Sequence, residues 1–188
     1  MRSLILIRHS AVAIDPDRPA SEWMLSAEGR RRCYELAAEL EAYHPAVFVS
    51  SVEPKAVETG RLLAETLGRP WTTAAGLHEH ERRSTPYFAD RAIFEAAVAQ
   101  FFARPDEMVL GEETAAQARG RFVAAVDDVL AAHPTGNVAI VSHGTVITLF
   151  LGHYNPHLDP FSLWRSLSLP CYFVVSAPGM KLVENGNL

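Results

Sequence analysis

Three short runs of apolar residues divide the chain, and each ends in polar or charged side chains. They cover Ser3 to Arg8, Val47 to Val49 and Val138 to Val141. The runs are rich in β-branched residues, and their apolar positions are consecutive where a half-buried strand would alternate. This pattern is typical of strands buried on both faces, so the sequence predicts interior strands at these places.

Between these runs the apolar residues recur at helical spacing. The pattern predicts helices from about Ala27 to Tyr43 with Ser26 as N-cap, from about Lys55 to Leu67 behind Pro54, and from about Glu113 to Ala132. Strands that alternate with helices indicate an α/β fold. We therefore expect a three-layer α/β/α sandwich with a mainly parallel central sheet.

Two further segments complete the predicted layout. Cys171 to Ser176 and Lys181 to Glu184 flank a turn and indicate a closing hairpin at a sheet edge. From Gly76 to Glu112 the periodicity loosens into a polar cluster and an aromatic-rich, helix-like stretch. A long excursion of this kind is more often a functional lid or pocket wall than an idle loop, so we expect one at about 81–110.

The composition suits a single globular domain over residues 1–188. Of these residues, 48% are hydrophobic and 21% are charged, within the usual range for a chain that buries its own core. The net charge of -5 and the pI of about 5.9 argue against a nucleic-acid partner. Any anion site must therefore be local.

The sequence also indicates where the protein resides. No stretch approaches the roughly 18 apolar residues that a membrane helix requires. The run Leu4 to Ile7 is too short for a signal peptide. Cys33 and Cys171 belong to no CxxC pair, so neither a disulfide framework nor a zinc ribbon is indicated. We expect a cytoplasmic protein with no membrane partner and two buried cysteines.

Candidate chemical groups follow the predicted strands. His9 comes directly after the first strand and His143 after the third, while Lys55 follows the second near a helix start. Ligands of open α/β sheets bind outside the carboxyl ends of the strands. Positive side chains beside a helix N-terminus form an anion site, for which phosphate is the natural ligand.

These residues belong to a series of short motifs that spans most of the chain. In order, the motifs are Arg8-His9, Leu25-Ser26-x-x-Gly29-Arg30, Ser50-Ser51-x-x-x-Lys55-Ala56-x-x-Thr59, Leu77-x-Glu79 and Ser142-His143-Gly144. Each string alone arises often by chance, but their joint order and spacing are specific. In these motifs the chain resembles the histidine phosphatase superfamily (phosphoglycerate mutase-like, branch 1).

The resemblance implies that His9 is the nucleophile, which attacks phosphorus in line and becomes a phosphohistidine. This attack requires a neutral imidazole, and nearby positive charge lowers the pKa of His9 and so favours that form. The resemblance also implies that Arg8, Lys55 and His143 surround the phosphate and neutralise its charge during transfer. Ser10 and Gly144 complete the expected phosphate site, and neither a metal nor another cofactor is implied.

Glu79 falls at the family's acid position. It would protonate the departing oxygen and then accept a proton from the water that hydrolyses the phosphohistidine. Glu81 is the alternative, although the Leu77-x-Glu79 context favours Glu79. His78 and His80 flank the acid, but a short His-x-His segment without further ligands is a weak indication of a metal site.

The chain departs from the family pattern at three places. Ser10 stands where many members have glycine, and Ala11 to Arg18 contains no counterpart of a commonly found asparagine. Lys55 replaces the usual arginine, which exchanges a planar two-pronged donor for a mobile point charge. This exchange should weaken the alignment of phosphate more than its attraction.

The leading hypothesis is a metal-independent phosphatase that hydrolyses a small phosphomonoester. A mutase and a non-catalytic phosphate or phosphoprotein binder are the alternatives, the latter because of Lys55 and Ser10. We expect specificity to reside in the loops Ala11 to Trp23, Glu81 to Asp106 and Asn155 to Trp164. The sequence leaves the substrate and the oligomeric state open.

Overall fold

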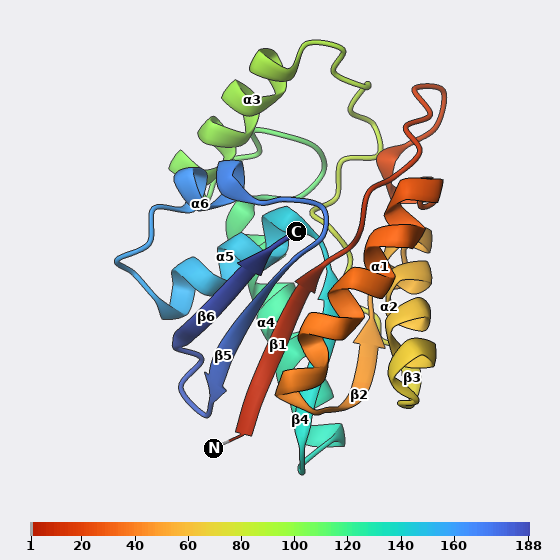
Figure 1. The fold of residues 1–188 in the computed structure, drawn as a ribbon. Coiled ribbons are helices and arrows are strands. Elements are labelled where there is room, and N and C mark those ends of the chain that lie inside the picture. The colour runs from red at the N-terminus through yellow and green to blue at the C-terminus, as the bar shows by residue number, and fades with distance from the viewer. Residues whose placement is uncertain (1) are drawn as a thin grey trace.

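A six-stranded sheet runs through the middle of the molecule, in the order β3-β2-β4-β1-β5-β6 (Figure 1). The computed structural model describes residues 2–188. The strands are β1 (Arg2–Arg8), β2 (Pro45–Ser50), β3 (Trp71–Thr73), β4 (Asn137–Ser142), β5 (Cys171–Ala177) and β6 (Leu182–Asn187). The first four pair in parallel and the last two are antiparallel, which confirms the predicted hairpin at the edge.

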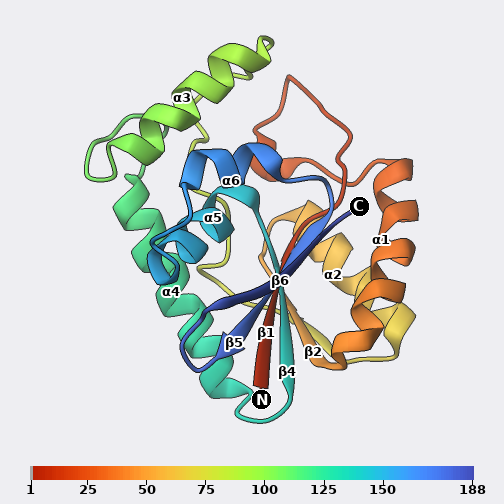
Figure 2. The same ribbon diagram turned by 60° about the vertical axis from the view of Figure 1, so that its left-hand side comes forward.

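Helices cover both faces of the sheet, as the α/β/α prediction requires. They are α1 (Ala27–Leu40), α2 (Pro54–Leu67), α3 (Arg91–Ala103), α4 (Ala115–Ala132), α5 (Gly144–Tyr154) and α6 (Pro160–Ser166), with short 3-10 helices η1 (Ala20–Glu22) and η2 (Glu41–Tyr43). Figure 2 shows α1 and α2 on one face and α4 and α5 on the other. Helices α3 and α6 lie beyond the carboxyl ends of the parallel strands.

The consecutive apolar residues of the inner strands serve two separate cores. In β1, Leu4 and Leu6 join the cluster beneath α4 and α5, whereas Ile5 and Ile7 join the cluster beneath α1 and α2. Neighbouring side chains of a strand point to opposite faces, so a strand covered on both sides must be apolar throughout. Each of these fully buried side chains contributes about 1.5–3 kcal/mol to folding.

Local signals fix where the helices begin and end. The Ser26 hydroxyl accepts the N–H of Gly29 at the start of α1, which confirms the predicted N-cap. Helix α2 has Pro54 in its first turn and ends at Gly68 in a left-handed conformation. Helix α4 starts at a capping box formed by Thr114, slightly later than predicted.

Several elements were not predicted. The three-residue strand β3 is too short to show a period, and α5 is so completely buried that its sequence has no polar stripe. Helix α6 begins within the Asn155 to Trp164 segment that was expected to be a loop and extends to Ser166. Cys33 and Cys171 are buried and unpaired, as expected. Within residues 2–188, no helix is both long and apolar enough to cross a membrane.

Candidate active site

The carboxyl ends of β1, β2 and β4 meet at one edge of the sheet. In the parallel register, Arg8 lies opposite Ser142 and Ser50 lies opposite Val141. The N–H of His9 donates to the carbonyl of Ser142 at 2.9 Å, so the chain leaves β1 still tied to β4. The residues that follow the three strands therefore share one crevice, where open α/β sheets bind ligands.

His9 is held with one ring nitrogen engaged. Its Nδ1 lies 2.8 Å from the carbonyl of Ser10, which can only accept, so Nδ1 carries the proton and Nε2 is the nitrogen with a lone pair. Burial and the nearby His143, Lys55 and Arg8 hold the pKa of His9 well below its ordinary value. The imidazole is therefore neutral near pH 7, which a nucleophile requires.

His143 lies beside His9, with ring centroids 5.2 Å apart. Its Nε2 is 2.8 Å from the Ser51 hydroxyl and 3.6 Å from Oε1 of Glu53. Its Nδ1 is buried and has no hydrogen-bond partner in the described part of the chain. Burial, followed by the charge of Lys55, holds the pKa of His143 well below its ordinary value. A bound anion would favour the charged form of this ring.

Arg8 reaches across the start of α5. Its Nη1 donates to the carbonyls of Leu167 at 2.9 Å and Ser168 at 3.3 Å, while its Nε is buried without a partner among residues 2–188. A Cβ at Gly144 would come within 3.1 Å of that Nε. Glycine at position 144 therefore makes room for the guanidinium group, which gives the Ser142-His143-Gly144 motif a steric reason.

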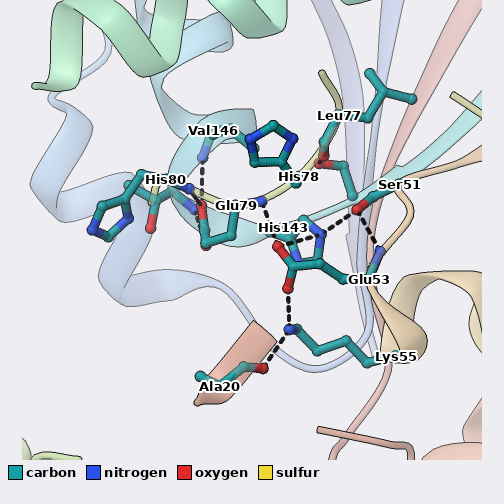
Figure 3. A network of polar contacts seen from close by, with 12 residues as sticks. Ala20, Ser51, Glu53, Lys55, Leu77, His78, Glu79, His80, His143 and Val146 are labelled. Carbon is teal, nitrogen blue, oxygen red and sulfur yellow. Dashed lines mark hydrogen bonds and ion pairs between the residues drawn. The ribbon is translucent and has the colours of Figure 1, made fainter. Parts of the chain in front are cut away.

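Lys55 enters the same site but is not free. Its ammonium forms an ion pair with the carboxylate of Glu53 and donates to the carbonyl of Ala20 at 2.7 Å (Figure 3). Both charged side chains are buried, with exposed fractions of 7% and 9%. Glu53 was not predicted as a site residue. The only signal in the sequence was its position two residues before Lys55, because a buried lysine requires a negatively charged partner.

Glu79 lies at the N-terminus of α5. Its carboxylate accepts the N–H groups of Thr145 at 3.1 Å, Val146 at 3.2 Å and His80 at 3.0 Å. An anion is stabilised here because the first N–H groups of a helix have no partner within the helix. The N–H of Glu79 itself donates to Glu53 at 2.9 Å, so the two carboxylates belong to one network.

The two candidate acids have different environments. Burial raises the pKa of Glu79, but His80, His143 and Arg82 outweigh that effect and the pKa lies below its ordinary value. The side chain of Glu81 is 55% exposed and lies 3.5 Å from His78, away from this network. The Glu79 carboxylate therefore lies in the buried network of the site, and the Glu81 carboxylate lies at the surface.

Arg121, on α4, fixes the segment that carries Glu79. Its guanidinium donates to the carbonyls of Gly76 at 2.7 Å, His78 at 2.9 Å and Glu79 at 3.1 Å. A carboxylate oxygen of Glu113 lies 2.5 Å from the same group and balances its charge. No local motif indicated this role, because the three carbonyls that accept from Arg121 lie more than forty positions away in the sequence.

Ser10 is placed differently from its expected role. Its hydroxyl donates to the carbonyl of Gly29 at 2.8 Å, and its N–H donates to the Thr59 hydroxyl at 3.1 Å. The side chain is fully buried. Its proton is therefore directed towards α1, and the serine ties the residue after the nucleophile to α1 and α2.

Arg82 lies within electrostatic reach of Glu79 and Glu53. Its guanidinium lies 4.8 Å from the centre of the Phe94 ring. Burial lowers the pKa of Arg82, and attraction to Glu79 and Glu53 opposes that effect. No side-chain hydrogen bond or ion pair of Arg82 is found within residues 2–188, and no three His, Cys, Asp or Glu side chains in that range are arranged to hold a metal ion.

The motifs of this site agree with a known family over nearly the whole chain. The family model described as histidine phosphatase superfamily (branch 1) matches residues 4–175. The chain belongs to this superfamily. Membership confirms the resemblance drawn from the ordered motifs. Among proteins with curated descriptions, no sequence matches the chain closely enough to be counted.

Solved structures share the fold across their full length. A protein described as mycobacterial hydrolase 1 has a TM-score of 0.77 at 22% identity, with 100% of both chains covered. Mycobacterial glucosyl-3-phosphoglycerate phosphatase with inorganic phosphate has a TM-score of 0.75 at 20% identity, covering 100% of this chain and 98% of that one. Phosphoserine phosphatase from Entamoeba histolytica with 3-phosphoglyceric acid has 0.77 at 16%, with 100% and 98% covered. At these identities the likeness establishes the fold.

Proposed function

We propose that the protein is a phosphatase that hydrolyses a small phosphomonoester through a phosphohistidine at His9. One observation carries the proposal: a buried, neutral His9 presents Nε2 at the same strand edge as Arg8, Lys55 and His143. Similarity to phosphatases that act on small phosphorylated metabolites supports this substrate class. The cations supply the charge neutralisation of phosphoryl transfer, so the chemistry requires no metal ion.

In the first step the Nε2 lone pair of His9 attacks phosphorus while the bond from phosphorus to the ester oxygen breaks. Arg8, Lys55 and His143 hold the non-bridging oxygens as charge moves onto them. The departing oxygen takes a proton from the Glu79 carboxyl and leaves as an alcohol. A phosphohistidine and an ionised Glu79 remain.

In the second step a water molecule attacks the phosphohistidine. Glu79 accepts a proton from the water as the new bond to phosphorus forms, and the bond from phosphorus to Nε2 breaks. Inorganic phosphate leaves, and both His9 and Glu79 return to their starting states. The lowered pKa keeps Glu79 ionised in the free protein, so it can accept a proton, although the same shift makes it a weaker base. The negative charge of a bound phosphoester raises that pKa, so proton uptake accompanies binding and prepares the acid.

The test is phosphate release from a panel of phosphomonoesters in the presence of a chelator, with trapping of the intermediate. We expect chelator-resistant turnover by the wild type and a His9 peptide that gains one phosphoryl group in mass spectrometry at neutral pH. His9→Ala removes both signals. Glu79→Gln slows turnover by about 10²–10⁴-fold, which is the range for loss of a general acid.

Two control variants show whether a substitution outside the catalytic residues also lowers turnover. His153→Ala changes an exposed histidine in the last turn of α5, and Glu81→Gln changes the neighbouring carboxylate that points to solvent. Both variants should retain wild-type turnover within about twofold. Phosphate release that survives His9→Ala would refute the mechanism, and loss in Glu81→Gln but not in Glu79→Gln would reverse the assignment of the acid.

A second candidate is a non-catalytic phosphate binder. The specific observation that favours it is the buried Glu53 carboxylate, which neutralises Lys55 inside the phosphate site. A phosphate site with less positive charge stabilises less well the negative charge that develops during phosphoryl transfer. Retained phosphate binding by calorimetry, with no phosphoryl group on His9 from any substrate, would establish this candidate instead.

A further inference from the structure

A cavity beside the phosphate site has walls of a different chemistry. It measures about 290 Å³ and is lined by the loop that follows β1 and by the segment that leads into α3. Four of its wall residues are aromatic: Trp23, Tyr87, Phe88 and Phe94. Two of the three loops that the sequence analysis linked to specificity line this cavity. The third, Asn155 to Trp164, does not line it in the described part of the chain.

Two residues join the cavity to the phosphate site. The carbonyl of Ala20, which accepts the Lys55 ammonium at 2.7 Å, belongs to a residue that lines the cavity. Arg82 also lines it, and its charge interacts with both Glu79 and Glu53. A phosphoryl group held at His9 would therefore direct the rest of its molecule into this space.

The cavity wall contains exposed apolar side chains beside the arginines Arg18, Arg82 and Arg91. Tyr87 is 45% exposed and Ile14 is 57% exposed, and both line the cavity. Large apolar side chains gathered on one surface usually mark a binding site. The rings of Trp23 and Tyr87 meet edge to face at 6.0 Å, and Phe94 lies 5.4 Å from Phe88. These walls have the geometry that receives another ring.

Resting on the proposed function, we propose that the substrates are phosphomonoesters whose alcohol carries an aromatic ring. An apolar cavity of roughly 150 Å³ holds one benzene ring, so a space of about 290 Å³ accommodates one or two fused rings. The Arg82 guanidinium, 4.8 Å from the Phe94 ring, supplies a planar cation on the same wall. A guanidinium group can stack on the aromatic ring of a substrate and donate hydrogen bonds to a polar substituent of that ring.

The test compares substrates whose leaving groups are equally reactive. Ethyl phosphate and 2-phenylethyl phosphate both release a primary alcohol, so their intrinsic chemistry is matched and only the ring differs. We expect kcat/KM to be about 100-fold higher for 2-phenylethyl phosphate, since single apolar groups in such pockets already give 10–200-fold discrimination. Hexyl phosphate tests an aliphatic chain of similar reach, and we expect it to be the poorer substrate.

A pair of tyrosine variants locates the preference. Tyr87→Ala removes a wall ring and should lower kcat/KM for 2-phenylethyl phosphate about 5- to 10-fold, while ethyl phosphate changes less than twofold. Tyr34→Ala makes the same change on α1, where Tyr34 is 56% exposed and outside the cavity. It should change neither substrate.

Binding to His9→Ala protein separates this inference from the catalytic proposal. Calorimetry with the same phosphate esters reports the cavity even if no substrate turns over, and we expect 2-phenylethyl phosphate to bind more tightly than ethyl phosphate. Equal binding and equal turnover of these two esters would refute the aromatic assignment while leaving the phosphatase intact, and so would a preference for hexyl phosphate. A ring preference in binding without any turnover would keep the cavity and overturn the phosphatase.

Discussion

The buried pair of Glu53 and Lys55 gives the sharpest prediction about the phosphate site. Glu53→Gln removes the negative charge but keeps the shape of the side chain. In the wild type, the two carboxylate oxygens of Glu53 serve the Lys55 ammonium and the N–H of Glu79. An amide has only one acceptor oxygen, so one of these donors loses its partner in the variant.

The magnitude follows from the burial of the pair. Complete loss of a partner from a buried ion pair costs about 3–5 kcal/mol. Lys55 keeps the carbonyl of Ala20 at 2.7 Å and one amide contact, so we expect a smaller loss, of about 2–4 kcal/mol. For a chain of this length each kcal/mol corresponds to roughly 2–4 °C in Tm, so the variant should melt about 4–16 °C lower.

Inorganic phosphate should reverse part of this loss. In the wild type, a phosphate dianion must share Lys55 and His143 with the Glu53 carboxylate, whereas in Glu53→Gln it meets the cations alone. We expect phosphate to bind the variant at least tenfold more tightly, which corresponds to about 1.4 kcal/mol. Saturating phosphate should therefore narrow the gap in Tm between variant and wild type by about 3–6 °C.

The assay is thermal unfolding with and without phosphate, supported by calorimetric titration of phosphate. Glu65→Gln is the matched control, because Glu65 lies on α2 in an exposed pair with Arg61 at 2.9 Å. Such exposed pairs contribute roughly 0.3–0.5 kcal/mol, and their loss should not respond to phosphate. A Glu53→Gln protein that is as stable as the wild type, or a gap that phosphate leaves unchanged, would refute the reasoning.

Three further predictions concern packing and pH. Gly144→Ala places a methyl group 3.1 Å from Nε of Arg8, so we expect kcat/KM for phosphate release to fall about tenfold with little loss of Tm. His80 is buried with a pKa of about 4, so protonation opposes folding from about pH 6.5 down to pH 4. His80→Met should remove about 3 kcal/mol from the fall in unfolding free energy over that range, measured by urea titration. Gly29→Ala would bring a Cβ within 2.0 Å of a backbone oxygen and should destabilise the protein by about 1–3 kcal/mol, also measured in urea.

Each of these predictions has an outcome that contradicts it. Unchanged turnover in Gly144→Ala would mean that the position of Arg8 does not matter for the reaction. An unaltered pH profile in His80→Met would show that His80 is not the group that resists protonation. Gly120→Ala is the control for Gly29→Ala, because it lies in α4 with nothing within 4 Å of the added Cβ and should stabilise the protein by up to about 1 kcal/mol.

Much of the fold could be predicted because its signals are local. Residues 3 to 8 had to form a strand covered on both faces, since consecutive apolar side chains alternate between two cores. Ser26 and Gly68 mark helix ends through bonds to their own neighbours. By contrast, α5 showed no amphipathic stripe because the protein buries almost all of its surface, and β3 was too short to carry a pattern.

The sequence alone also indicated the chemistry of the site. Residues directly after parallel strands meet at one edge of a sheet, so the sequence is sufficient to group His9, Lys55 and His143. The choice of Glu79 over Glu81 rested only on sequence context. In the tertiary structure the Glu79 carboxylate receives the first N–H groups of α5, whereas Glu81 faces solvent, and the role of Glu79 as the acid stays a prediction.

Only the tertiary structure decided how the charged groups are paired. Glu53 neutralises Lys55, Arg121 holds the segment of Glu79 from another helix, and the Ser10 hydroxyl turns away from the crevice. Side-chain direction and long-range hydrogen bonds depend on how the elements pack, and no local pattern records them. The residue types and their order along the chain thus determined the family and the candidate nucleophile, whereas packing determined the charge of the phosphate site and the aromatic cavity beside it.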